Sequence, residues 1–329
     1  MPVMIEYRAA VWQLRHFLAQ ARDSLARERA VPASAALQHE LSELLASFEQ
    51  QARRIPPSDS THPAFAQAEL HPLLLGAPFA ERCFRKPLGF AGDYEMVNML
   101  LGESHTRPPD GFTRLVNDVL TNVPVAQAHR NRVALLERAL LAETTRVNQA
   151  GRMCGVVSVG CGPAVEIQRF LRRPEPASGC ILHLLDFNDE TLEHVQGCIR
   201  SILAGRPRSP VVKLFRQSVE DILAAPEGGA GPRRAAYDFA YCTGLMDYFT
   251  DDVCRALLGT LRGWLRPGGL LLASNVHPDN PQRHCMEHLV EWYLIHRDED
   301  QLRALAPPGS EARVYRDATG LNVFVELRG

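Results

Sequence analysis

Short apolar runs alternate with amphipathic segments from Gly151 to the end of the chain, and this alternation is the strongest constraint on the fold. Seven of the runs have the length and composition of β-strands. They are Gly155–Val159, Cys180–Asp186, Val211–Arg216, Asp238–Cys242, Gly269–Asn275, Ala312–Asp317 and Leu321–Leu327. The last two flank Ala318–Gly320, so we expect a terminal hairpin that adds an antiparallel edge strand to a parallel sheet.

Five amphipathic segments lie between these runs and predict helices. They are Ala164–Arg172, Glu190–Leu203, Val219–Ala225, Asp251–Leu265 and Gln282–His296. Strand–helix alternation places helices on both faces of the sheet. We therefore expect an α/β, Rossmann-like domain that binds its ligand at the carboxyl ends of the strands, near the point where the strand order reverses.

The first 150 residues have a helical pattern instead. Apolar residues recur at helical spacing in Val3–Arg29, Ser34–Arg54, Phe112–Asn122 and Pro124–Asn148. Arg53–Pro63 is rich in Pro and Ser and is interpreted as a connector. A chain of 329 residues accommodates about two domains. We expect a helical domain over residues 1–124, serving as lid, substrate domain or dimer interface, and the α/β domain over residues 125–329.

The composition excludes several classes of protein. The formal net charge of −2 argues against nucleic acid as the main partner. No apolar run approaches the ~18 residues that span a bilayer, and Met1–Arg8 lacks the order of a secretory signal. The eight cysteines form no CxxC pair and lie mostly among apolar residues. We expect a cytoplasmic protein with reduced cysteines and a small-molecule or lipid-like substrate; a homodimer is left open.

A glycine-containing loop follows the first expected strand. Its sequence is Val159-Gly160-Cys161-Gly162-Pro163-Ala164-Val165-Glu166. Two glycines one residue apart let the backbone turn tightly and approach a ligand closely. The second expected strand ends in Asp186, placed either to accept hydrogen bonds from ribose hydroxyls or to cap the next helix. Loop and acid together indicate nucleoside recognition, and both NAD and S-adenosylmethionine fit this outline.

The chain over about residues 125–329 resembles the class I S-adenosylmethionine-dependent methyltransferases. The resemblance rests on the following stretches: Val156–Glu166, Asp186, Gln217-Ser218, Tyr237–Cys242 and Leu265–Gly269. It implies S-adenosyl-L-methionine as cofactor and a seven-stranded methyltransferase sheet. Two positions depart from the family pattern, since Ser158 stands where an acid is frequent and Ala164 where a third glycine is frequent.

The same resemblance assigns roles around the cofactor by position. Gly160, Cys161, Gly162, Pro163 and Glu166 would form the glycine loop, with Asp186 and Phe187 at the ribose. Gln217 and Ser218, after the third strand, would flank the adenine. Tyr241, Thr243 and Gly244, at the end of the fourth strand, would line the sulfonium end.

Two further stretches resemble a bacterial subgroup of these enzymes. They are Arg82–Val97 and Ser274–Pro281. The subgroup includes makers of 3-hydroxy fatty acid methyl esters, which serve as quorum signals. It is also similar to enzymes that cyclise S-adenosylmethionine to azetidine-2-carboxylate and release methylthioadenosine. The motifs do not separate these two relatives.

Polar residues in these stretches are the candidates for chemistry. Arg85, Lys86, Asp93 and Tyr94 would belong to a lid, the cations pairing with a carboxylate and the Tyr94 ring lying on the sulfonium. The alternative is a polar interdomain loop. Asn275 and His277 follow the fifth strand, where His277 could act as a general base. The alternative is a turn held by Asx hydrogen bonds and prolines.

Two other patterns favour a structural interpretation. His284 and His288 lie four residues apart on an expected helix, a spacing that could bind a metal, but a partly buried polar face is favoured and no metal is predicted. The Arg-rich stretch Arg130–Arg138 is interpreted as a solvated helix face.

A sulfonium activates three carbons, so aligning the reactants supplies much of the catalysis. Three hypotheses remain open. The first is methyl transfer to a small or lipid-like acceptor, of which a carboxylate is one case. The second is intramolecular cyclisation of S-adenosylmethionine, for which Tyr94, Tyr241 and Asn275 are the candidate catalytic residues that would hold the attacking amine. The third is a catalytically silent nucleotide-binding module.

Overall fold

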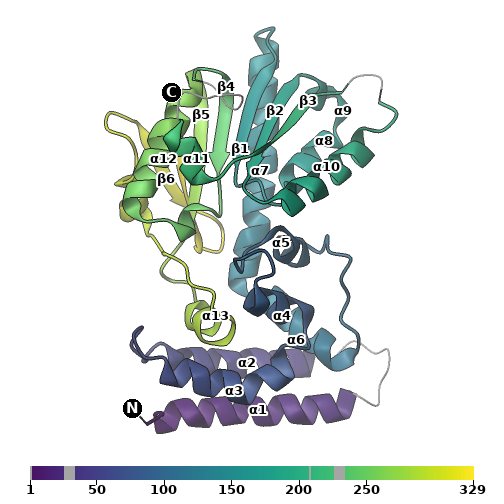
Figure 1. The fold of residues 1–329 in the computed structure, drawn as a ribbon, viewed down its shortest axis with the longest axis vertical. Coiled ribbons are helices and arrows are strands. Elements are labelled where there is room, and N and C mark those ends of the chain that lie inside the picture. Colours follow the sequence, from purple (N-terminus) through teal and green to yellow (C-terminus); the bar gives the residue numbers. More distant parts are fainter. Residues whose placement is uncertain (1, 26–33, 207–208, 226–233) are drawn as a thin grey trace. The chain divides into compact units, whose positions relative to one another are not determined.

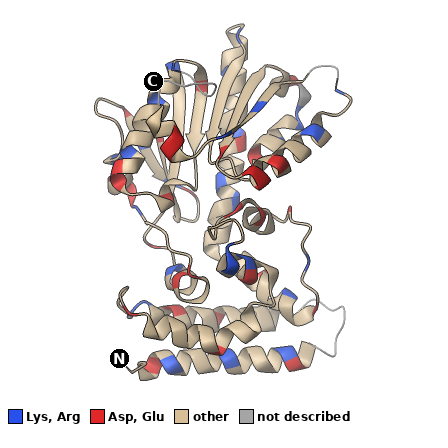
Figure 2. Cartoon of the chain, in the orientation of Figure 1, with Lys and Arg blue, Asp and Glu red and all other residues tan. Residues whose placement is uncertain are grey.

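The computed structural model describes residues 2–25, 34–206, 209–225 and 234–329. These residues form two compact units. One unit comprises Met1–Gln127 together with Asn280–Tyr293, and the other comprises Ala128–Asp279 together with Leu294–Gly329. Figure 1 shows the helical unit and the sheet-containing unit. Figure 2 shows acidic and basic residues mixed along the helices of each.

The sheet-containing unit is built on seven strands, which confirms the predicted α/β, Rossmann-like fold. They are β1 (Cys154–Val159), β2 (Cys180–Asp186), β3 (Val211–Arg216), β4 (Tyr237–Cys242), β5 (Leu265–Val276), β6 (Ala312–Arg316) and β7 (Asn322–Arg328). Their order is β3-β2-β1-β4-β5-β7-β6. The first five are parallel, and β7 pairs antiparallel with both β5 and β6. The order reverses between β1 and β4, which fixes where a ligand is expected.

Helices cover both faces of this sheet (Figure 1). On one face, α7 (Pro124–Gln149), α8 (Val165–Leu171), α9 (Pro174–Ser178) and α10 (Asp189–Leu203) contribute side chains to a core that includes Phe170 and Leu182. On the other face, α11 (Val219–Ala224), the short η1 (Met246–Tyr248), α12 (Asp251–Trp264) and α14 (Glu299–Arg303) pack around Leu258 and Leu271. The central strands β1 and β4 are therefore buried on both sides.

The helical unit contains seven helices among the described residues. They are α1 (Ile5–Leu25), α2 (Ala35–Ala52), α3 (Thr61–Leu74), α4 (Pro78–Arg85), α5 (Tyr94–Leu101), α6 (Gly111–Thr121) and α13 (Arg283–Val290). Leu14, Leu41 and Leu70 lie in its main core. The prediction of a connector over Arg53–Pro63 is confirmed only in part, because α3 begins at Thr61. The expected helix Val3–Arg29 extends into residues 26–29, which lie outside the described residues.

Helix α13 departs from two predictions. The expected helix Gln282–His296 ends at Val290, because Glu291 takes a left-handed conformation with φ of 52°. The segment also belongs to the helical unit, although the sequence places it in the continuous domain 125–329. The Glu49 carboxylate of α2 accepts the Cys285 N–H at 2.7 Å and the His284 N–H at 3.2 Å. Leu289 is buried in the same core, so capping and burial hold α13 on the helices of the first unit.

Two chemical features hold across the described residues. All eight cysteines are free thiols. No helix in the described part of the chain is both long and apolar enough to cross a membrane.

Candidate functional site

The glycine loop after β1 has the backbone shape that the sequence predicts. Gly160 and Gly162 adopt left-handed conformations, with φ of 66° and 51°. A Cβ on Gly160 would lie 2.9 Å from the Leu245 Cδ2, so a side chain there would be strained by its φ and would have to displace Leu245. A Cβ on Gly162 would meet no atom within 4 Å. The loop is thus packed tightly at Gly160 and open at Gly162, where a ligand can approach its backbone.

Ala164 takes the place of a third glycine without changing the shape of the loop. Its φ is 50°, a left-handed value that an alanine adopts at a cost of roughly 1–2 kcal/mol. The Ala164 N–H donates to the Cys161 carbonyl at 3.0 Å, and the Pro163 carbonyl accepts the Gln168 side-chain amide at 2.8 Å. These two bonds hold the strained turn at the start of α8.

Asp186 ends β2 beside this loop. Its Oδ2 accepts the Gly162 N–H at 3.0 Å, and its Oδ1 accepts the Asn188 N–H at 3.1 Å. The cap of α10 is Asn188, not Asp186, because Asn188 accepts the Thr191 N–H at 2.9 Å. Burial raises the pKa of Asp186. A carboxylate has about four lone-pair positions, so Asp186 keeps acceptor capacity for a ligand while it fixes the loop.

The residues after β3 lie next to Asp186. The Gln217 N–H donates to the Asp186 carbonyl at 3.0 Å. The buried Gln217 Oε1 has no hydrogen-bond partner among the described residues, so it can accept a hydrogen from a ligand. Ser218 is used differently than predicted, because its hydroxyl donates to Asp221 Oδ2 at 2.9 Å and caps α11. Phe187, the residue after Asp186, is 44% exposed.

Tyr241 and Glu166 form a buried pair below the loop. The Tyr241 hydroxyl donates to Glu166 Oε1 at 2.8 Å. Both side chains are buried, and burial raises the pKa of each. The Tyr241 ring also stacks on Phe239, with centroids 5.1 Å apart. Tyr241 therefore links β4 to α8 within the core, which differs from its predicted place lining the sulfonium end.

Arg132 of α7 reaches the carboxyl end of β4, near Gly244. The sequence interpretation of Arg130–Arg138 as a solvated face is wrong for Arg132, which is only 9% exposed. A Cβ on Gly244 would lie 2.7 Å from the Arg132 guanidinium, and Gly244 has a φ of 73°. Arg132 Nη2 lies 2.8 Å from Nε2 of His129. Thr243 precedes this glycine and is half-buried.

The sequence contains a signal that Arg132 is buried, although its partners follow only from the tertiary structure. Arg132 falls at helical spacing between Ala128 and Leu136, which are both buried. A charged residue inside an apolar stripe is the signal that distinguishes it from Arg138, which is exposed on the same helix.

Asn275, predicted as catalytic, is committed to structure. It is fully buried, and its Nδ2 donates to the carbonyls of Ile295 at 2.8 Å and Val276 at 3.1 Å. Its Oδ1 accepts from Arg297 Nη1 at 2.8 Å. Arg297 also donates to the carbonyls of Met246 and Phe249. Asn275 therefore positions the segment that follows β4.

His277, the second catalytic prediction, is 4% exposed. Its Nδ1 accepts the Asp279 N–H at 3.0 Å, and its Nε2 lies 3.4 Å from Glu299 Oε2. Arg316 donates to Glu299 at 2.6 Å. These contacts place His277 in the turn after β5 and leave Nδ1 unavailable as a base. The buried Nε2 has no hydrogen-bond partner among the described residues.

The predicted lid residues lie in the helical unit. Asp93 is 1% exposed, accepts from Arg82 Nε at 2.7 Å and caps α5 by accepting the Met96 N–H at 2.9 Å. The Arg82 guanidinium lies 5.7 Å from the centre of the Tyr94 ring. Asp93 is therefore a structural residue, and one cation already faces Tyr94.

The two predicted lid cations also have partners within the helical unit. Arg85 donates to Glu81 at 2.9 Å on an exposed surface. Lys86 adopts a left-handed φ of 48° and lies 3.7 Å from Glu291.

The two histidines of α13 also have protein partners. His284 lies 2.7 Å from Glu49 Oε1, and His288 Nδ1 lies 3.0 Å from the Tyr7 hydroxyl. No group of three or more His, Cys, Asp or Glu side chains within the described ranges could hold a metal ion.

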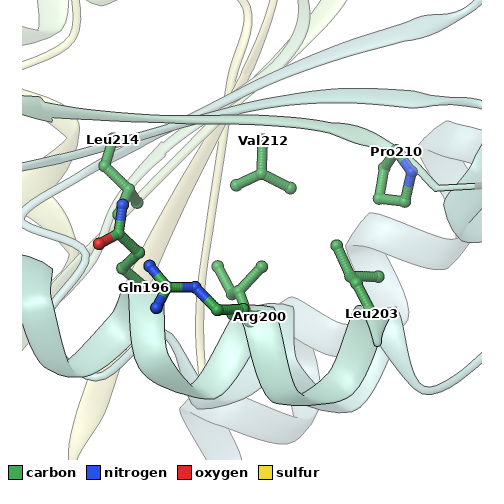
Figure 3. Close-up of a pocket in the computed structure, with 7 residues that line it drawn as sticks. Gln196, Arg200, Leu203, Pro210, Val212 and Leu214 are labelled. Carbon is green, nitrogen blue, oxygen red and sulfur yellow. The ribbon is translucent and has the colours of Figure 1, made fainter. Parts of the chain in front are cut away.

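A groove of about 340 Å³ lies away from the glycine loop, between α10 and the edge strand β3. Its lining residues are Gln196, Ile199, Arg200, Leu203, Pro210, Val212 and Leu214. Figure 3 shows Val212 and Leu214 facing the helix that carries Arg200. The two polar side chains that line it, Gln196 and Arg200, are both exposed.

The strand order, the reversed β7 and the glycine loop between β1 and α8 define a Rossmann-like methyltransferase fold with an added helical unit. A possible exported protein from Bordetella parapertussis is 21% identical, with a TM-score of 0.55 over 97% of this chain and 96% of its own. A candidate methyltransferase from Thermobifida fusca is 15% identical, with a TM-score of 0.52 over 71% of this chain and 93% of its own. Likeness at these identities shows the fold. No protein-family model and no curated protein sequence matches the chain.

Proposed function

We propose that this protein is an S-adenosyl-L-methionine-dependent methyltransferase acting on a small or lipid-like acceptor. The observation that carries the proposal is the joint geometry of the glycine loop and Asp186. Gly160 and Gly162 turn the backbone at the end of β1, and Asp186 holds Gly162 while keeping free acceptor positions. This combination at the switch point of a parallel sheet is suited to a nucleoside.

Two further side chains at the carboxyl ends of β2 and β3 support a nucleoside ligand. Gln217 offers an unused, buried carbonyl oxygen, which suits the exocyclic amine of adenine. Phe187 offers an exposed ring next to Asp186, against which a base can pack. The glycine loop alone would suit either S-adenosylmethionine or NAD. The strand order, with its antiparallel β7, is of the methyltransferase type and therefore favours S-adenosylmethionine.

S-adenosylmethionine, when bound, supplies a methyl group on a sulfonium that a nucleophile displaces in line. The chain's own contribution would be binding and alignment. Asp186 would orient the ribose, Gln217 the adenine, and the Tyr241–Glu166 pair would keep the glycine loop in place on β4. Holding an acceptor at near-attack distance lowers the barrier by about 7–11 kcal/mol in favourable cases.

A carboxylate acceptor such as a 3-hydroxy acid agrees with the contacts of the two predicted catalytic residues that follow β5. His277 Nδ1 is already an acceptor within a turn, and both Asn275 amide hydrogens are donated to backbone carbonyls. A carboxylate is nucleophilic at neutral pH and needs no deprotonation. An acceptor with a neutral hydroxyl would require a base that these residues do not supply.

The test is to incubate purified protein with S-adenosylmethionine, with and without a series of 3-hydroxy acids, and to separate the nucleoside products. S-adenosylhomocysteine that appears only with an acceptor supports methyl transfer. Methylthioadenosine formed without any acceptor contradicts it and assigns the protein to intramolecular cyclisation. Absence of cofactor binding in a calorimeter contradicts both and leaves a silent module.

A further inference from the structure

We infer that Arg132 and His129 form a carboxylate-binding site at the carboxyl end of β4. Arg132 is nine-tenths buried, yet its hydrogen-bond partner among the described residues is the ring of His129. Burying a charged group without an opposite charge is costly. A guanidinium presents donors in a planar fork that matches a carboxylate.

His129 does not neutralise Arg132. Burial and the charge of Arg132 lower the pKa of His129 well below its ordinary value. The imidazole is therefore neutral at physiological pH and accepts a hydrogen from the guanidinium. This holds the guanidinium in one orientation without using its charge.

Asp247 and Glu166, the two carboxyl groups that act electrostatically on Arg132, have other hydrogen-bond partners. Asp247 Oδ1 accepts the Val276 N–H at 2.7 Å, and Glu166 Oε1 accepts the Tyr241 hydroxyl at 2.8 Å. Both act on Arg132 through the electrostatic field, and no ion pair joins either of them to it among the described residues. They reduce the cost of burying the cation and leave donors of its fork for a ligand.

The backbone is adapted to this arrangement. Gly244 has a φ of 73°, and a Cβ there would lie 2.7 Å from both Nη1 and Nη2 of Arg132. Glycine is thus required both by the turn after β4 and by the guanidinium lying on it. The cation is placed where open α/β sheets bind their ligands.

The inference rests on the proposed function, because a carboxylate at this position has two sources. One is the α-carboxylate of S-adenosylmethionine, and the other is a carboxylate on the acceptor. The test compares wild type, Arg132→Gln and the matched control Arg138→Gln, since Arg138 is an exposed arginine of the same helix. Each is titrated calorimetrically with S-adenosylmethionine and with decarboxylated S-adenosylmethionine, which lacks only the carboxylate.

If Arg132 holds the cofactor carboxylate, Arg132→Gln weakens binding of S-adenosylmethionine about ten- to a hundredfold. Binding of the decarboxylated compound is then unchanged, which also shows that the variant is folded. If Arg132 holds the acceptor, both titrations are unchanged, and the KM of a 3-hydroxy acid rises about tenfold or more while that of its amide does not. The Arg138→Gln variant behaves as wild type in every case.

Equal weakening for both cofactors, or no change in either titration or in the acceptor KM, would overturn the inference. A wild-type protein that binds neither cofactor would instead refute the proposed function. An Arg132→Lys variant serves as the second check. It keeps the charge but loses the fork, so an intermediate loss of affinity for the carboxylate-bearing ligand is expected.

Discussion

The carboxylate of Asp186 accepts the backbone N–H of Gly162 at 3.0 Å, which ties the end of β2 to the loop after β1. One side chain thus joins the two elements that a nucleoside would contact. Because Asp186 keeps further acceptor positions, we expect the same carboxylate both to shape the loop and to bind a ligand.

Replacing Asp186 with alanine should weaken S-adenosylmethionine binding by roughly 1–3 kcal/mol, because ribose hydroxyls lose their acceptor. Calorimetric titration measures the change. The control is Asp189→Ala, which removes an exposed acid of α10 paired with Arg216. Unchanged affinity in Asp186→Ala would remove Asp186 from the cofactor site.

Replacing Tyr94 with phenylalanine should leave turnover nearly intact, because a ring that faces a cation acts through its π-face. Arg82 already lies 5.7 Å from the centre of this ring, and phenylalanine keeps that contact. Steady-state kinetics of the purified variant tests the expectation. A loss of kcat of a hundredfold or more would show that Tyr94 contributes to catalysis through its hydroxyl instead.

Replacing Asn275 with alanine should reduce stability more than it reduces chemistry. The change leaves the Ile295 carbonyl without its donor and Arg297 without one acceptor. Each buried group left unpaired costs about 1–3 kcal/mol. Urea unfolding should show that loss, while kcat of the folded variant stays within about threefold of wild type. A normal midpoint combined with a collapsed kcat would restore the catalytic role that the sequence predicts for Asn275.

His288 should make stability depend on pH under mildly acidic conditions. Burial, and then the charge of His284, lower the pKa of His288 from 6.5 to about 4 in the folded protein. Between pH 6.5 and 4 the unfolded chain binds a proton that the folded chain does not, so stability falls as the pH falls through this window. The contribution is fully present above pH 6.5 and is on the order of 2 kcal/mol.

The pH effect is measured as the difference in unfolding free energy between wild type and His288→Phe, from pH 4 to pH 7. The phenylalanine keeps a ring beside Tyr7 and Phe48 but cannot take up a proton. The difference isolates His288 from His183, whose pKa is also lowered by burial. Parallel stability curves for the two proteins would show that His288 does not contribute.

The strands could be predicted because each combines an apolar run with local boundaries. β2 and β3 have the predicted limits, and β1 and β4 differ by one residue at the start. The glycine loop could be predicted for the same reason, since its shape depends on residues next to one another. The residues that determine these strand limits and this loop shape lie within a few positions of one another in the sequence.

Features with weak periodicity, or with partners far away in the sequence, could not be predicted. Helix α3 contains Pro72 and has apolar residues around much of its surface, so its periodicity is weak. The first turn of α13 is capped by Glu49, which is more than 230 positions away in the sequence. Asp93 and Ser218 have the residue types of a site, but each caps the helix that begins at the next residue, a local role that their positions could have indicated. Burial decides the role of Arg132, and only tertiary structure supplies it.

The placement of α13 with the helical unit has a consequence for how the protein can be divided. The chain passes from one compact unit to the other three times, at Gln127–Ala128, Asp279–Asn280 and Tyr293–Leu294. A fragment that ends at residue 127 would lack Leu289 and would leave the Glu49 carboxylate without the two amides it caps. The helical unit is therefore complete only after residue 293 has been synthesised, so its final packing follows synthesis of residues 128–279 of the other unit.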